Sequence, residues 1–215
     1  MQYKRWMQLF IGLMFYAVGI VFTINANMGL APWDAFHMGL TYITHLSFGL
    51  ISIIVGLLVL LITYQLNEGI GIGTIANIVV IGVLIDLIFY LNLIPVVHNM
   101  VAGTAMLIIG MELIALGSFF YIGSGFGTGP RDGLMVALTR TTKKPIGLIR
   151  ASIEISVLIA GYLLGAKIGI GTLIVGFGIG PIVQITFKLL KFNVNTVNHR
   201  VILIKNGHIQ PELLD

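Results

Sequence analysis

The chain has 215 residues, of which 57% are hydrophobic and only 9% are charged. Soluble domains carry about 25% charged residues, so this composition excludes a soluble domain and predicts a protein embedded in a lipid bilayer. Its net charge of +4 does not indicate nucleic-acid binding, because the basic residues lie at the ends of hydrophobic segments and form no stripe. The chain has no cysteine, which excludes disulfides, thiolate catalysis and cysteine metal sites.

Six hydrophobic segments are long enough to cross a bilayer, which takes about 20 apolar residues. They cover approximately residues 6–25, 48–66, 74–94, 101–122, 146–164 and 172–190. Lys4 and Arg5 precede the first segment, as in a signal peptide, but no convincing cleavage site follows it. We therefore interpret it as a retained span. The fold class predicted is an all-α integral membrane protein with six transmembrane helices.

The chain contains an internal duplication. A shift of 98 positions lays Ile11–Phe89 over Ile109–Phe187 without a gap. The strongest matches are Met28–Asp34 over Phe126–Asp132 and Ile70–Thr74 over Ile168–Thr172. A period this long is typical of a duplicated half-fold rather than a solenoid. We predict a single membrane domain made of repeats 1–95 and 101–190, followed by a short cytoplasmic tail, 191–215.

The charges of the loops predict how the repeats are oriented. Each repeat has three spans, so the second must enter the membrane from the side opposite to the first. The loop around 26–47 has no Lys or Arg, whereas its counterpart around 123–145 has four and the tail adds more; Lys167 alone falls on the outer side. The positive-inside rule then predicts inverted repeats with both termini in the cytoplasm.

A Gly-x-x-Pro-x-Asp motif follows the first span of each repeat and predicts short helices at about 33–46 and 131–144. Fourteen residues span only about 21 Å, which is too short to cross. Asp34 and Asp132 fall in the first turns, where the helix dipole favours negative charge. Asp34 and His37 begin a polar stripe. Such a helix either lies on the membrane surface or re-enters the membrane to line a cavity, and both alternatives stay open.

Four charged residues lie within the predicted spans, where a charge is costly and usually faces the interior. Glu112 is mid-span without a local partner, which makes it a candidate for a proton relay or cation site. Asp86 is similar but nearer the outer surface. Arg150 and Glu154 are four residues apart, so they either form an intrahelical ion pair or act in gating.

The candidate residues for solute binding or coupling are Asp34, Asp132, Glu112, Asp86, Arg150, Glu154, His37 and Arg131. The histidines lack metal-ligand spacing, and no nucleophile–base pair or phosphate loop is present, so we expect no metal, no cofactor and no enzyme activity. Trp6, Trp33 and Tyr42 are candidate interfacial anchors. Closely spaced glycines such as Gly12, Gly19 and Gly176–Gly180 predict tight helix packing. Residues 199–209 predict a short hairpin.

At these motifs the chain resembles the YczE/YyaS/YitT group of bacterial integral membrane proteins, closest to the YczE branch. The matching elements are Gly29–Leu40, Gly71–Asn77, Gly125–Met135, and Arg150 with Glu154. The resemblance implies location in the bacterial cytoplasmic membrane. It supplies no activity or substrate, and the soluble C-terminal domain of the larger YitT-type members has no counterpart here.

The leading functional hypothesis is a small secondary transporter or exporter of an unidentified solute, with its site between the two repeats. The alternative is a non-transporting membrane factor that assembles with or regulates another membrane protein. A channel formed by a homo-oligomer is a third option. The expected partners are the lipid bilayer and a small solute, and not nucleic acid.

Overall fold

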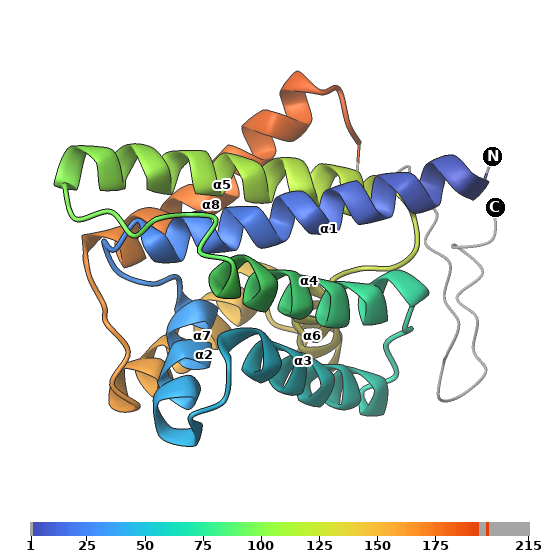
Figure 1. Ribbon diagram of the computed structural model, residues 1–215. Helices are drawn as coiled ribbons and strands as arrows, with labels where there is room; N and C mark the ends of the chain where they lie inside the picture. The colour runs from blue at the N-terminus through green and yellow to red at the C-terminus, as the bar shows by residue number, and fades with distance from the viewer. Residues whose placement is uncertain (1, 194–196, 198–215) are drawn as a thin grey trace.

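The computed structural model describes residues 2–193 and residue 197. These residues form eight α-helices (Figure 1): α1 (Gln2–Asn25), α2 (Pro32–Thr44), α3 (Phe48–Gln65), α4 (Ile72–Tyr90), α5 (Met100–Gly123), α6 (Pro130–Thr142), α7 (Ile146–Leu163) and α8 (Ile170–Leu189). All six predicted long helices and both short ones are present, with ends within a few residues of those expected. The predicted hairpin at 199–209 lies outside the described residues.

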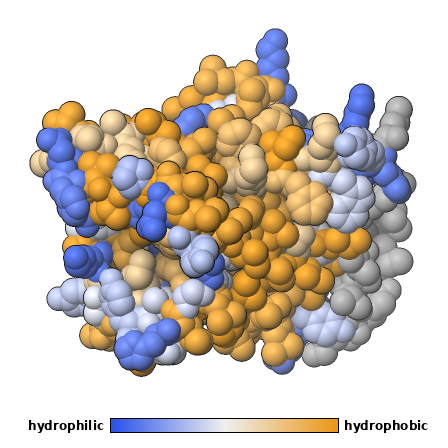
Figure 2. All heavy atoms as spheres, viewed as in Figure 1, coloured by the Kyte–Doolittle hydropathy of each residue, from blue (hydrophilic) through white to orange (hydrophobic). Residues whose placement is uncertain are grey.

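The six long helices are long and apolar enough to cross a membrane. Their outward faces expose large hydrophobic side chains; Phe177 and Val101 are each 80% exposed. Hydrophobic residues cover most of the middle of the molecule in Figure 2, and most hydrophilic ones lie toward its left and right margins. This is the surface expected of a protein whose solvent is the bilayer.

The second four helices repeat the first four. Helices α1 and α5 each have 24 residues, α2 and α6 each have 13, and α3 and α7 each have 18. Their boundaries differ by the 98 positions of the sequence duplication. Helices α1 and α5 lie side by side and run in opposite directions (Figure 1).

Glycines hold α1 and α5 together, as the sequence predicts. A Cβ atom added at Gly12 would lie 2.9 Å from the carbonyl oxygen of Gly117, and one added at Gly117 would lie 2.9 Å from that of Gly12. Gly19 and Gly110 make the same reciprocal approach, at 2.8 and 2.9 Å. Small residues allow this close contact, which replaces the hydrophobic driving force that is missing in lipid.

The loops before α2 and α6 also dock reciprocally. The amide of Gly171 donates to the carbonyl of Met28, and the amide of Gly73 donates to that of Phe126, both at 2.8 Å. Gly29 and Gly127, which follow these carbonyls, have φ angles of +112° and +132°, a conformation that a side chain would strain. The start of α8 thus binds the loop before α2, and the start of α4 binds the loop before α6.

The short helices α2 and α6 leave the centre of the protein toward opposite sides. The end of α6 is tied to the α3–α4 turn by an ion pair of 3.0 Å between Arg140 and Glu68. That turn lies on the same side as the start of α1, which we call the N-terminal side (Figure 1). The end of α2 packs against the end of α7 through Gly39 and Leu164, on the opposite side.

One helix pair breaks the correspondence between the halves. Helix α3 packs along α4, and Gly49 of α3 meets the backbone of Gly82. Helices α7 and α8 are not a packed pair among the described residues, and α8 turns away from α7 in Figure 1. A Cβ atom added at Gly147, Gly176 or Gly180 would have nothing described within 4 Å. The predicted tight packing of Gly176 and Gly180 is therefore not present in this conformation.

Candidate functional site

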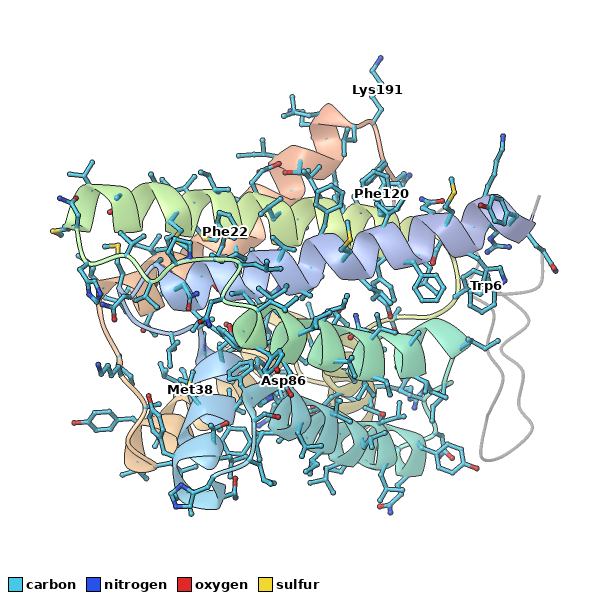
Figure 3. All side chains as sticks on the ribbon, viewed as in Figure 1. Trp6, Phe22, Met38, Asp86, Phe120 and Lys191 are labelled. Atoms are coloured by element: carbon cyan, nitrogen blue, oxygen red, sulfur yellow. The ribbon has the colours of Figure 1, made fainter. Side chains whose placement is uncertain are left out.

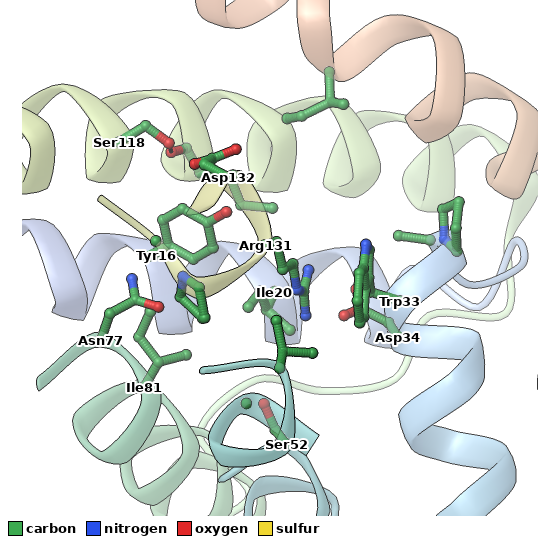
Figure 4. Close-up of a pocket in the computed structure, with 18 of the residues that line it drawn as sticks. Tyr16, Ile20, Trp33, Asp34, Ser52, Asn77, Ile81, Ser118, Arg131 and Asp132 are labelled. Carbon is green, nitrogen blue, oxygen red and sulfur yellow. Dashed lines mark hydrogen bonds between the residues drawn. The ribbon is translucent and has the colours of Figure 1, made fainter. Parts of the chain in front are cut away.

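A cavity of about 210 Å³ lies at the centre of the molecule and takes lining residues from all eight helices. Figure 4 shows it from close by. Hydrophobic and aromatic side chains form most of the wall. The polar and charged lining residues are Tyr16, Asp34, His37, Ser52, Asn77, Ser118, Tyr121, Arg131, Asp132, Arg150 and Glu154.

Most lining positions come in pairs that are 98 residues apart. The pairs include Tyr16 and Ile114, Ile20 and Ser118, Trp33 and Arg131, Asp34 and Asp132, Ser52 and Arg150, Gly56 and Glu154, Asn77 and Val175, and Ile81 and Ile179. The cavity is therefore formed by the same surface of each half. Only the aspartate pair is charged in both halves. The remaining charges, Arg131, Arg150 and Glu154, come from the second half.

The N-termini of α2 and α6 both open into this cavity. Each helix has proline, Pro32 or Pro130, in its first turn, preceded by an extended residue, so its path starts as the motif predicts. The first N–H groups of a helix lack partners within the helix and carry partial positive charge. Two such N-termini facing one cavity create a region that attracts negatively charged groups.

Asp34 and Asp132 stand in the first turns of these helices, which lie outside the six long spans. Asp34 is 4% exposed. Asp132 is surrounded by protein, yet its side chain is accessible from the cavity. Burial raises the pKa of Asp34 to about 6, with Arg131 opposing the shift. Burial also raises the pKa of Asp132, against the opposing effect of Arg150 and Arg131.

Arg131 lies over the ring of Trp33, with its guanidinium carbon 4.8 Å from the ring centroid. Figure 4 shows both side chains in the cavity, with Asp34 beneath Trp33. A cation held against an aromatic face keeps its N–H groups free in the plane of the guanidinium. Trp33 is therefore a cavity residue and not the interfacial anchor that the sequence suggested.

Two other predicted site residues line the cavity as an ion pair. Nε of Arg150 donates to Oε1 of Glu154 at 3.0 Å, one turn apart on α7. This confirms the intrahelical pair. His37 also lines the cavity and is 2% exposed; burial, aided by Arg131, lowers its pKa well below the ordinary value, so the ring is neutral at pH 7. Its Nδ1 atom has no hydrogen-bond partner among the described residues.

Asp86 lies away from the cavity, and its position indicates a structural role. Its carboxylate accepts hydrogen bonds from the amides of Gly49 at 2.7 Å and Leu50 at 3.2 Å, and from the hydroxyl of Ser47. It thereby caps the start of α3 from α4, and Figure 3 shows it beside that helix. This bond set joins α3 to α4.

Glu112 is the candidate that the structure separates most clearly from the others. It is exposed, accepts a hydrogen bond of 2.9 Å from Thr186 on α8, and does not line the cavity. The residues of α5 that do so include Ile114, Ser118 and Tyr121, which form one helical stripe. Glu112 precedes Ile114 by two positions, about 200° around the helix, so it points elsewhere.

Sequence reasoning missed Tyr16, Ser52, Ser118 and Tyr121, and it assigned Asn77 to helix packing. Their positions in the duplication carry a signal, because Ser52 is equivalent to Arg150 and Ser118 to Ile20, and both members of each pair line the cavity. Polar side chains within the spans, compared between equivalent positions of the two halves, would have indicated the cavity.

Comparison with known proteins gives the family. The family model described as "Family of unknown function (DUF6198)" matches residues 3–188. The chain belongs to this family. It is 35% identical over 167 residues to "Uncharacterized membrane protein YczE" of Bacillus subtilis (strain 168), a match that covers 77% of each chain.

Two further relatives match over most of their length. An "Uncharacterized protein" of Haemophilus influenzae (strain ATCC 51907 / DSM 11121 / KW20 / Rd) is 30% identical, with 88% of this chain and 86% of that one covered. "Uncharacterized protein YyaS" of Bacillus subtilis (strain 168) is 25% identical, with 77% and 83% covered. No solved structure matches. These matches confirm the resemblance to the YczE and YyaS proteins and identify a membrane protein.

Proposed function

We propose that this protein is a small secondary transporter whose two halves are inverted repeats and whose solute site is the central cavity. The observation that carries this proposal is that equivalent residues of both halves line the cavity. The starts of two short helices also face it. Secondary transporters commonly bind their substrates between repeats, at the ends of broken helices near the middle of the bilayer.

The charges support an orientation with both termini in the cytoplasm of a bacterium. Helices α1 and α5 run in opposite directions, as equivalent helices of inverted repeats must (Figure 1). Most basic residues lie near helix ends on the N-terminal side, whereas Lys167 lies in the α7–α8 connection on the other side. Those on the N-terminal side are Lys4, Arg5, Arg140, Lys143, Lys144, Lys188 and Lys191. The N-terminal side is then the cytoplasmic side.

The difference between the α3–α4 and α7–α8 pairs supports alternating access. The packed contact of α3 with α4 at Gly49 and Gly82 lies near the start of α3, on the outer side in this orientation. The equivalent positions, Gly147 and Gly180, are apart near the cytoplasmic side. We infer from this difference that the cavity is closed to the outside and open inward. Separation of α3 from α4, together with packing of α7 on α8, would open the cavity to the outside.

Helix α8 carries the residues that such a movement needs. Gly176, Gly178 and Gly180 precede Pro181, which lies inside the helix. Glycine weakens a helix, and an interior proline removes a backbone hydrogen bond and kinks it. The equivalent stretch of α4, from Ile78 to Val83, has one glycine and no proline. In this proposal α8 bends and α4 is the stiffer partner.

Transport by the purified protein in liposomes tests this function although the solute is unidentified. Liposomes are incubated with a ¹³C-labelled small-molecule extract of bacterial cells, and their contents are measured by mass spectrometry. At least one solute should accumulate above empty liposomes, and Asp34→Asn or Asp132→Asn should abolish its entry. Glu112→Gln is the matched control, because it changes a carboxylate to an amide outside the cavity and should leave entry intact.

An extract from which no solute enters above the empty-liposome level would contradict the proposal. Entry that survives both aspartate changes would contradict the site. Topology is tested separately with single cysteines at Thr44 and Thr142, which are exposed at the ends of α2 and α6. An impermeant thiol reagent should label the first from outside and the second from the cytoplasmic side; labelling from one side would refute inversion.

A further inference from the structure

Three charged groups in the cavity are held by no hydrogen bond or ion pair from the described residues, although Arg131 acts electrostatically on both aspartates. Among the described residues, Asp34, Asp132 and Arg131 make no hydrogen bond and no ion pair; Arg131 has only the ring of Trp33 beneath it. Asp34 is more than nine-tenths buried. Buried charges are normally paired, and those that are not are costly unless something else binds them. These three groups are therefore available to a ligand.

The unpartnered groups are of both signs. An anionic solute would pair with Arg131 and leave two carboxylates facing it. A cationic solute would pair with a carboxylate and leave Arg131 both desolvated and repelled. Burying an unpaired charge in this way costs several kcal/mol. A solute that carries one positive and one negative group pairs with Arg131 and with one carboxylate at once.

The net charge of the cavity points the same way. Asp34 and Asp132 contribute two negative charges and Arg131 one positive charge, while Arg150 and Glu154 neutralise each other. The N-termini of α2 and α6 add about half a positive charge each. The sum is near zero, so the cavity favours a solute without net charge.

We propose that the solute is a small zwitterion of the amino-acid type, with a carboxylate and an ammonium group. The guanidinium of Arg131 binds the carboxylate in a bidentate manner, and Asp132, which is accessible from the cavity, binds the ammonium. The side chain of the solute packs against apolar lining residues such as Ile20 and Ile81. The substrate class rests on the proposed function, but the binding it predicts is measured without transport.

The test compares three pools of compounds that share their side chains. The first contains L-alanine, L-leucine and L-phenylalanine. The second contains the corresponding amines, which lack the carboxylate, and the third the corresponding carboxylic acids, which lack the amino group. Binding to the purified full-length protein is measured at pH 7 by calorimetry. We expect the amino acids to bind at least about tenfold more tightly than either reference pool.

Two variants assign the roles. Arg131→Gln should remove the preference for amino acids over amines, while amine binding survives. Asp132→Asn should remove the preference for amino acids over carboxylic acids. Arg140→Gln is the control, because Arg140 pairs with Glu68 at the far end of α6 and should leave all three affinities unchanged.

Amines or acids that bind as tightly as the amino acids would overturn the proposal, as would no binding by the amino-acid pool. Neither result would affect the transport test, in which any solute of the labelled extract counts. Conversely, amino-acid binding without any flux would contradict the transporter and retain the binding site.

Discussion

The α3–α4 pair and the α7–α8 pair have the same origin in the sequence and different arrangements in the structure. In the first pair Gly49 meets Gly82, and Asp86 caps α3. In the second pair, no atom of the described residues lies within 4 Å of a Cβ atom added at Gly147 or Gly180. In the proposed alternation, each pair adopts the arrangement that the other pair has in this structure. Under this proposal, the packed α3–α4 pair is the model for a closed α7–α8 pair.

The contact residues of the two pairs are complementary rather than identical. In the packed pair, Gly56 of α3 makes room for Ile78 of α4, at 2.9 Å from an added Cβ atom. At the equivalent positions, α7 has the large residue, Glu154, and α8 has the small one, Gly176. Closure of α7 on α8 would seat Glu154 against Gly176. In this structure Glu154 lines the cavity.

The largest effects are expected when the same substitution is made in both pairs. Gly82→Leu should prevent folding or cost several kcal/mol, because a Cβ atom there lies 2.5 Å from Ile53. Gly180→Leu should leave stability nearly unchanged, since nothing described lies within 4 Å, but it should abolish transport by blocking closure. Thermal unfolding and liposome flux measure the two effects. Equal loss of stability in both variants would contradict the open arrangement of α7 and α8.

An intermediate effect is expected at Asp86, which joins α4 to the start of α3, compared with its equivalent in α8, Gln184. Asp86→Ala should destabilise the protein by about 1–3 kcal/mol, because the Gly49 amide at the start of α3 loses its acceptor and the Leu50 amide keeps only the hydroxyl of Ser47. Gln184→Ala, at the equivalent exposed position of α8, should change stability by less than about 0.5 kcal/mol. Denaturant unfolding of the two variants compares these costs. A larger loss for Gln184→Ala would show that α8 is held to α7 after all.

A smaller effect is expected from pH, through Asp34, whose equivalent in the second half is Asp132. The pKa of Asp34 is raised to about 6, so below this pH the group takes up a proton and loses its negative charge. Affinity for an amine should fall by up to about tenfold between pH 7 and pH 5. In Asp34→Asn this decrease should be smaller. Calorimetry at several pH values measures it, and an amine affinity that rises on acidification would contradict the assignment.

Much of the fold could be predicted from the sequence because its signals are local. Runs of apolar residues determine the six long helices, and proline with its preceding extended residue determines where α2 and α6 begin. The duplication of Met28–Asp34 in Phe126–Asp132 placed both aspartates at the same point of each half. Asp34, Asp132, Arg131, His37, Arg150 and Glu154 do meet at one cavity.

The rest depends on rotation and packing, which local patterns do not specify. Glu112 was the leading candidate within a span because it lacked a nearby partner in sequence, but Thr186 of α8 supplies one and the helix turns it away from the cavity. The sequence suggested that Trp33 is an interfacial anchor, but in the structure its ring lies against Arg131 of α6. Gly147 and Gly180 do not reveal the separation of α7 from α8, because both match their packed counterparts in sequence.

Disulfide trapping of the α7–α8 pair tests the proposed alternation most directly, because the chain has no cysteine of its own. Ala151 and Gly180 are equivalent to Ile53 and Gly82, which touch in the packed pair. Cysteines at Ala151 and Gly180 should form a disulfide when the protein visits the other state, and this bond should stop transport until it is reduced. Failure of the pair to cross-link, in a variant that still transports, would contradict closure of α7 on α8 and with it the alternation of the two halves.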